Sequence, residues 1–274
     1  MNAAMTQRQP PGWVVFFSIL LLLATGVLMV FAALAGITGL DAVRSTRSVT
    51  SSVAVGDRPS VQIDVPAGAV TVIAGDAGRV TLDDRVSVRA LTRHLAQLGS
   101  EQYRVARLSA TADGAAVSIP PQPFGFDFLN TSVDRSLTVH VPADTSVHLS
   151  GGNVAATLDG LRGNAEVDVN NGAVRFRNAT VTGSTAIRAT NGGVDFEGAI
   201  NEGARLEMTT TNGAIRARLP SATNATYDAA TTNGRVFVRG GGSGGTGVHM
   251  TGVLGTGGTA TIYLRAVNGS IAIL

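Results

Sequence analysis

The sequence of 274 residues contains no cysteine, which excludes disulfide scaffolds, thiolate zinc sites and cysteine nucleophiles. It also contains no lysine, so all 21 of its basic residues are arginine. Aromatic residues make up only 5% of the chain and charged residues only 15%. The formal net charge of +2 provides no electrostatic footprint for nucleic acid, and we expect no nucleic-acid partner.

One long run without charge lies near the N-terminus. Residues 13–37 carry no charged side chain, and a helix of that length would cross a hydrocarbon core of ~30 Å. We therefore expect a short tail over residues 1–12, a transmembrane helix in the lipid bilayer over 13–37 and a linker over 38–48. Ala33-Leu34-Ala35 has the small-x-small form of a signal-peptidase site, so a cleaved leader is the alternative to an anchor.

An internal repeat organises the second half of the chain. Asn-Gly pairs recur there, with successive glycines 20, 21, 21 and 35 residues apart. The pairs are Asn171-Gly172, Asn191-Gly192, Asn212-Gly213, Asn233-Gly234 and Asn268-Gly269. Apolar and polar residues alternate on both sides of each pair, which predicts two short β-strands joined by a corner in every unit.

Two all-β architectures fit these units. Asn-Gly between alternating strands is typical of β-hairpins, whereas stacking of the units about 4.8 Å apart would give a β-solenoid. The charges at equivalent positions favour stacking, because they alternate in sign from unit to unit. These positions hold Arg175, Asp195 and Arg216 in one row and Arg177, Glu197 and Arg218 in another. The sequence thus predicts a β-solenoid (β-helix) of about 20-residue coils over residues 49–274, with a short helix over 90–98.

The repeated corner asparagines are predicted to form a structural ladder. Asparagine tolerates a left-handed corner conformation, and its amide can hydrogen-bond to the unit above. A calcium site would require carboxylates at these positions, and none is present. We interpret the five asparagines and the six charged residues above as structural, and expect no cofactor, metal or catalytic residue.

Other motifs give no support to an enzyme. Gly241-Gly242-Ser243-Gly244-Gly245 matches a nucleophile elbow as a string, but it lies in a glycine-rich stretch without the required strand and helix. The four histidines do not show metal-ligand spacing, and no HExxH motif occurs.

The apolar start, the strand-rich entry, the segment Thr138-Val139-His140-Val141-Pro142 and the Thr-Asn-Gly units together resemble the bacterial putative-adhesin domain family. The resemblance covers residues 50–274 and implies a β-helical, non-catalytic surface domain with no established ligand and no catalytic residues. We expect a single-pass protein of the bacterial cell membrane whose soluble domain lies outside the cytoplasm. We expect this domain to act as an adhesion or interaction module toward an unknown envelope protein or a glycan.

Two alternatives stay open. One is a self-assembling envelope or cytoskeletal scaffold of bactofilin-like type, associating through the coil that ends at Leu274. The other is a β-helical enzyme that cleaves polysaccharides, which would require grouped carboxylates.

Overall fold

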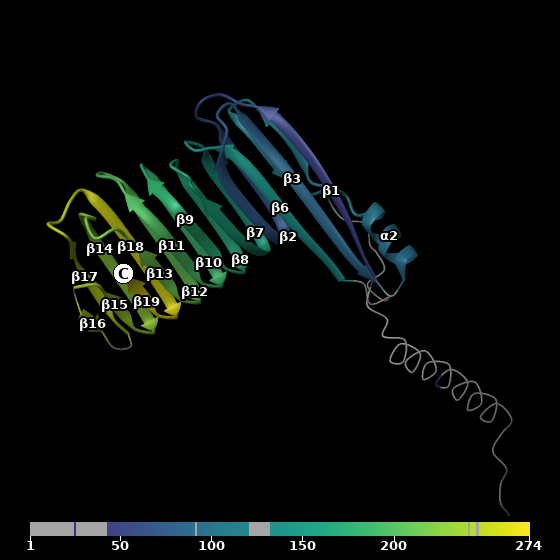
Figure 1. Cartoon of the computed structure of the whole chain (residues 1–274). Coiled ribbons are helices and arrows are strands. Elements are labelled where there is room, and N and C mark those ends of the chain that lie inside the picture. The colour runs from purple at the N-terminus through teal and green to yellow at the C-terminus, as the bar shows by residue number, and fades with distance from the viewer. Residues whose placement is uncertain (1–24, 26–42, 91, 121–131, 241, 245–246) are drawn as a thin grey trace, which may run out of the picture.

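A computed structural model describes residues 25, 43–90, 92–120, 132–240, 242–244 and 247–274 (Figure 1). The regular structure in this part is dominated by strands, and the helix α2 (Arg93–Gln102) follows the third of them. The 19 strands found among these described residues all belong to one sheet. The expectation of an all-β fold is therefore confirmed.

The strands lie in two rows that face each other across the core. In pairing order, the first row contains β4 (Arg107–Thr111), β5 (Gly114–Ser118), the first half of β2 (Ser60–Gly75), the first half of β7 (Ser146–Asp159), β8 (Ala165–Asn171), β10 (Ser184–Asn191), β12 (Arg205–Asn212), β18 (Ala260–Asn268), β14 (Ala225–Asn233) and β17 (His249–Leu254). The second row contains β1 (Val43–Ala54), β3 (Arg79–Ala90), β6 (Ser132–Pro142), the second halves of β2 and β7, β9 (Val174–Val181), β11 (Val194–Ile200), β13 (Ile215–Arg218), β19 (Ile271–Ile273), β15 (Val236–Val238) and β16 (Gly242–Gly244).

The long strands β2 and β7 connect the two rows. The first half of β2 pairs with β5 and its second half with β6, and β7 pairs with β8 and then with β9. Each strand thus bends from one row into the other. The result is a single sheet that is nearly closed and barrel-like around its core.

Alternation of apolar and polar residues decides which side chains enter that core. In β8, Val167 and Val169 are buried whereas Glu166 and Asp168 are exposed. Apolar residues from neighbouring strands meet in register inside, so that Ile187 pairs with Met208 and Met208 pairs with Leu264. Most of the buried apolar residues form one hydrophobic cluster, and its burial is the main stabilising contribution to the fold.

The Asn-Gly pairs are corners between the rows. The strands that flank Asn171-Gly172, β8 and β9, pair with strands of other units and not with each other. The hairpin interpretation is therefore wrong. The glycine is needed because of close approach: a Cβ at Gly192 would collide with the carbonyl oxygen of Gly172 in the neighbouring unit.

The strands near the C-terminus are not in sequence order. β18 lies between β12 and β14, and β19 lies between β13 and β15. The long interval between Gly234 and Gly269 makes this order possible. Its residues form β16 and β17, which pair antiparallel with β15 and β14, before the chain returns between the earlier strands.

The predicted β-solenoid over 49–274 is corrected by these pairings. Regular 20-residue units cover only part of the domain, and β1, β3 and β6 pair antiparallel next to them. The strands therefore close into one barrel-like sheet instead of continuing as successive coils. The C-terminal segment is also internal, because β19 is paired on both sides. Self-association through an uncovered final coil is excluded for that reason.

The transmembrane helix predicted over 13–37 lies outside the described residues, apart from Thr25. Within the described residues, no helix has both the length and the apolar character needed to cross a bilayer. The single-pass membrane location expected from the sequence is accordingly withdrawn.

Two boundaries differ from expectation. β1 begins at Val43, within the residues 38–48 assigned to a linker. The helix expected over 90–98 is α2 at Arg93–Gln102, and its N-cap is Thr92, whose Oγ1 accepts a hydrogen bond of 3.3 Å from the Leu95 amide.

Candidate functional site

A groove of about 830 Å³ crosses the outer face of the first row, from β7 to β17. Its lining is rich in side chains that both donate and accept hydrogen bonds. These include Ser150, Thr190, Thr209, Thr211 and Thr232. Seven strands in succession contribute to it, so it extends over about 29 Å at the usual strand spacing.

Strand register gives the groove its regular lining. The outward residues Asp168, Arg188, Thr209 and Arg265 occupy paired positions on β8, β10, β12 and β18. Side chains at such positions recur at the strand spacing of about 4.8 Å. The groove is thus a periodic surface that combines hydroxyl, charged and apolar side chains.

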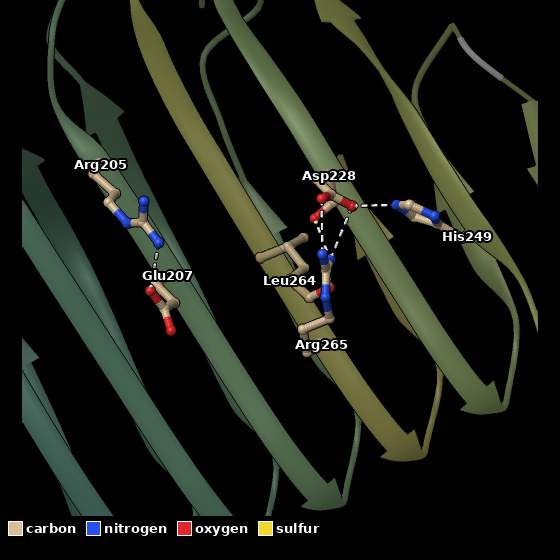
Figure 2. A network of polar contacts seen from close by, with 6 residues as sticks. All are labelled: Arg205, Glu207, Asp228, His249, Leu264 and Arg265. Carbon is tan, nitrogen blue, oxygen red and sulfur yellow. Dashed lines mark hydrogen bonds and ion pairs between the residues drawn. The ribbon is translucent and has the colours of Figure 1, made fainter.

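A cluster of three ionisable residues lies at the β17 end of the groove (Figure 2). Arg265 Nη1 donates to Asp228 Oδ1 at 3.0 Å and Arg265 Nη2 donates to Asp228 Oδ2 at 2.7 Å. His249 Nε2 lies 2.6 Å from Asp228 Oδ1. The three residues come from the adjacent strands β18, β14 and β17, so the pairing of β14 with both neighbours assembles the cluster.

The Asp228 carboxylate is held in its ionised form. The hydrogen bond from Arg265 lowers the pKa of Asp228, and His249 contributes in the same direction against the opposing effect of burial. Arg265 Nη1 also donates to the Asp228 carbonyl at 3.0 Å and to the Leu264 carbonyl at 3.1 Å. The Arg265 guanidinium therefore binds both the carboxylate and the backbone, and the Asp228 carboxylate contacts both Arg265 and His249.

This cluster differs from a catalytic triad. A Ser-His-Asp mechanism needs a hydroxyl hydrogen-bonded to the imidazole, and among the described contacts the partner of the His249 ring is the Asp228 carboxylate. The described residues also contain no group of three or more His, Asp or Glu side chains placed to hold a metal ion. The arrangement is suited to binding polar groups and orienting side chains.

A second pair stands next to this cluster on β12 (Figure 2). Arg205 Nη2 donates to Glu207 Oε2 at 2.9 Å, and the Arg205 guanidinium lies 4.2 Å from the centre of the Tyr263 ring. The ring and the carboxylate both stabilise the cation.

The opposite end of the groove is also charge-compensated. Arg188 Nη1 donates to Glu166 Oε1 at 3.1 Å and lies 3.7 Å from Asp168 Oδ2. His148 Nδ1 lies 3.3 Å from Glu166 Oε2. Each arginine of the groove therefore has a carboxylate partner, and the surface between the two ends is uncharged.

The asparagines singled out from the sequence lie along one corner of the sheet. Their Nδ2 atoms donate to the Oδ1 atom of the next asparagine at 2.7–2.8 Å. The order is Asn153, Asn171, Asn191, Asn212, Asn268 and Asn233. Asn153 was missed in the sequence because Gly151-Gly152 precedes it and no glycine follows it. None of these asparagines has a positive φ, since Asn178 is the described non-glycine residue with that conformation.

The charged residues singled out from the sequence lie on the second row, away from the groove. Asp195 is paired in register with both Arg175 and Arg216. Its hydrogen bond comes from a diagonal neighbour, because Arg218 Nη1 donates to Asp195 Oδ1 at 2.7 Å. 

The other series of charges, Arg177, Glu197 and Arg218, is less regular. Glu197 pairs with Arg218 across β11 and β13. A β-bulge between Phe196 and Gly198 interrupts the register between β11 and β9. Arg177 of β9 is instead paired with Asp159 of β7, the strand on the other side of β9.

The residues of the groove cluster were not identified from the sequence. Asp228, His249 and Arg265 come from the irregular part of the repeat, where the strand order could not be inferred. The available signal was the threonine that precedes each asparagine at Thr190, Thr211 and Thr232, which indicated a hydroxyl row beside the corner.

No protein-family model matches the sequence, and no curated protein matches it. Solved structures with a similar arrangement include a putative cell adhesion protein from Clostridium sporogenes, with 13% identity and a TM-score of 0.49 over 84% of this chain and 99% of that one. A putative adhesin from Bacteroides fragilis has 14% identity and a TM-score of 0.31 over 84% and 98%. A putative lipid binding protein from Parabacteroides distasonis has 13% identity and a TM-score of 0.26 over 83% and 97%.

At these identities and TM-scores the similarities carry no argument about what this chain binds. Two further similar structures, from Parabacteroides distasonis and Parabacteroides merdae, are also described as putative adhesins.

Proposed function

We propose that this chain is a non-catalytic adhesion module, and that its groove binds an extended, hydroxyl-rich polymer such as a glycan chain. The observation that carries the proposal is the groove itself, which crosses seven strands and presents hydroxyl groups on four of them, β7, β10, β12 and β14. A polymer of polar repeating units can form hydrogen bonds at several of these strands along its length.

Charge compensation favours a ligand of low charge. Arg188 is paired with Glu166 and Asp168, and Arg265 is paired with Asp228. An acidic polymer would have to displace these carboxylates. A neutral ligand can instead use the hydroxyl groups between the two ends without breaking an ion pair.

The ion pairing of the carboxylates argues against the polysaccharide-cleaving enzyme. Asp168 on β8 and Asp228 on β14 are four strand spacings apart, about 19 Å. Glu207 on β12 and Asp228 are two spacings apart, about 10 Å, but each is bound to an arginine, Arg205 and Arg265. Glycoside hydrolysis uses two carboxyl groups about 5–10 Å apart. Glu166 and Asp168 lie closer together, but both contact Arg188.

The test is binding of the full chain to an array of neutral and acidic glycans. Thr211→Tyr places a bulky side chain on the exposed lining of the groove, and we expect at least a tenfold loss of binding. Thr226→Tyr is the matched control, because Thr226 is exposed on β14 but does not line the groove. Absence of glycan binding, or equal losses in the two variants, would contradict the proposal.

A further inference from the structure

One edge of the sheet is unpaired and carries no permanently charged side chain. Among the described residues, β17 pairs with β14 on one side and with no strand on the other. Its residues, from His249 to Leu254, include no Asp, Glu, Arg or Pro.

The hydrogen-bond pattern shows which groups of β17 face outward. The Thr231 amide donates to the Val248 carbonyl at 2.9 Å, so this pair is hydrogen-bonded across the two strands. Hydrogen-bonded and non-bonded pairs alternate in antiparallel ladders. The backbone N–H and C=O groups of His249, Thr251 and Val253 therefore point away from β14, and their side chains are exposed.

The other described edges carry the features that prevent strand addition. β16 has only three residues, and β4 has five, beginning with Arg107. β1 carries Arg44 and Arg47, and α2 lies beside it, where Ser45 Oγ and Ser100 Oγ are 3.0 Å apart. Short length, charge and a covering helix are the usual means of protecting an edge. β17 has none of them.

We propose that β17 pairs antiparallel with β17 of a second copy of this chain, about a two-fold axis at Thr251. This register places Thr251 opposite Thr251 and His249 opposite Val253 of the other copy. The three outward residues are symmetric about Thr251, so every outward N–H and C=O group of both strands finds a partner. A closed two-fold pairing leaves no free edge at this side of the sheet.

The low charge and the apolar exposure at the β17 edge support pairing with a second copy of this chain. The nearest carboxylate behind the edge is Asp228, which lies opposite Thr251 and is neutralised by Arg265. In the dimer the two Asp228 residues would be three strand spacings apart, about 14 Å, which exceeds the Debye length of about 10 Å. Val253 is 59% exposed, and the partner strand would cover it.

The absence of cysteine allows a direct test by disulfide trapping. In the proposed register, Thr251→Cys brings two thiols together at a hydrogen-bonded pair with a Cα separation of about 5.5 Å, within the range for a disulfide. Val253→Cys is the matched control on the same edge, because its equivalent lies more than 10 Å away, by the rise of about 3.4 Å per residue. We expect mild oxidation of the full chain to cross-link T251C at least tenfold faster than V253C.

The second measurement is sedimentation. One strand pair buries less surface than a standard interface of about 800 Å² per partner, so we expect a weak dimer that depends on concentration. Thr251→Pro removes an outward N–H without touching the ladder to β14, and should weaken the dimer at least tenfold while leaving the thermal melting of the monomer nearly unchanged. Thr251→Lys serves the same purpose if the proline variant does not fold.

The proposal is overturned if T251C and V253C cross-link at equal rates, or if the wild-type chain sediments as a monomer at all concentrations. It is also overturned if T251P or T251K dimerises like the wild type. None of these outcomes bears on glycan binding in the groove, so the two proposals are tested separately.

Discussion

Arg135 and Asp84 form a bidentate ion pair between β6 and β3, with Nη2 to Oδ2 at 2.6 Å and Nε to Oδ1 at 3.0 Å. The two side chains are only 8% and 1% exposed. The pair also ties down the chain after α2, because Asp84 Oδ2 accepts a hydrogen bond of 2.7 Å from the Ala106 amide and Arg135 Nη2 donates to the Arg104 carbonyl at 2.8 Å. Sequence inspection gave no sign of this pair, since its partners are 51 residues apart.

Asp84→Ala should be strongly destabilising, because it leaves the Arg135 guanidinium buried without a counter-ion. We expect a loss of about 3–5 kcal/mol in the free energy of unfolding, measured by urea denaturation. Asp134→Ala is the control on the same strands, since Asp134 and Arg89 form an exposed pair at 3.7 Å that should contribute no more than about 1 kcal/mol. Similar losses for the two variants would argue against the structural role of the buried pair.

Asn212→Ala tests the asparagine ladder. Asn212 both donates to Asn191 at 2.7 Å and accepts from Asn268 at 2.8 Å, whereas Asn233 at the end of the ladder makes only the bond to Asn268. With about 0.5–1.5 kcal/mol for each hydrogen bond, Asn212→Ala should cost about twice as much as Asn233→Ala. Thermal unfolding of both variants measures the ratio, and equal effects would mean that the ladder bonds contribute little.

Asp195→Arg tests the alternating charges on the second row. The substitution removes the bond from Arg218 and places three arginines in adjacent register positions, with Arg175 and Arg216 on either side. We expect a destabilisation of about 0.5–1 kcal/mol that decreases when salt is added. Asp195→Ala is the control that removes the bond without adding a positive charge. An unchanged melting temperature for the arginine variant would refute this interpretation.

The groove cluster predicts a dependence of stability on pH. Because the folded-state pKa of Asp228 is lowered from 3.8, its ionised form stabilises the fold above that value. The contribution is lost as the pH falls from about 4 through the lower folded-state pKa. Unfolding curves between pH 7 and pH 2 should therefore show a smaller loss in Asp228→Asn than in the wild type. Parallel profiles for the two proteins would contradict the assignment.

The all-β class could be predicted because alternation with period 2 is a local property of the sequence. Val167 and Val169 enter the core and Glu166 and Asp168 face water, as their pattern requires. The Asn-Gly signal was ambiguous because a corner and a hairpin turn use the same residue types. At Gly192 the decisive factor is the approach of the Gly172 carbonyl from another unit, a contact that no local window contains.

The strand order and the groove cluster depend on long-range pairing. Sequence order would place β14 beside β12, but β18 occupies that position. Asp228 meets Arg265 only because of this exchange. The antiparallel pairing of β1 with β3 and of β3 with β6 likewise lies outside the repeated units. Period and spacing therefore predicted the strands themselves but not the architecture that they form.

The position of β18 and β19 also constrains how the chain reaches its native state. Residues 225–238 do not pair with residues 205–218 in the native sheet, because residues 260–273 lie between them. The edge formed by β12 and β13 consequently stays open until a segment some 50 residues further along the chain arrives. Closure of such a long loop is slow, so we expect this docking step to limit the folding rate.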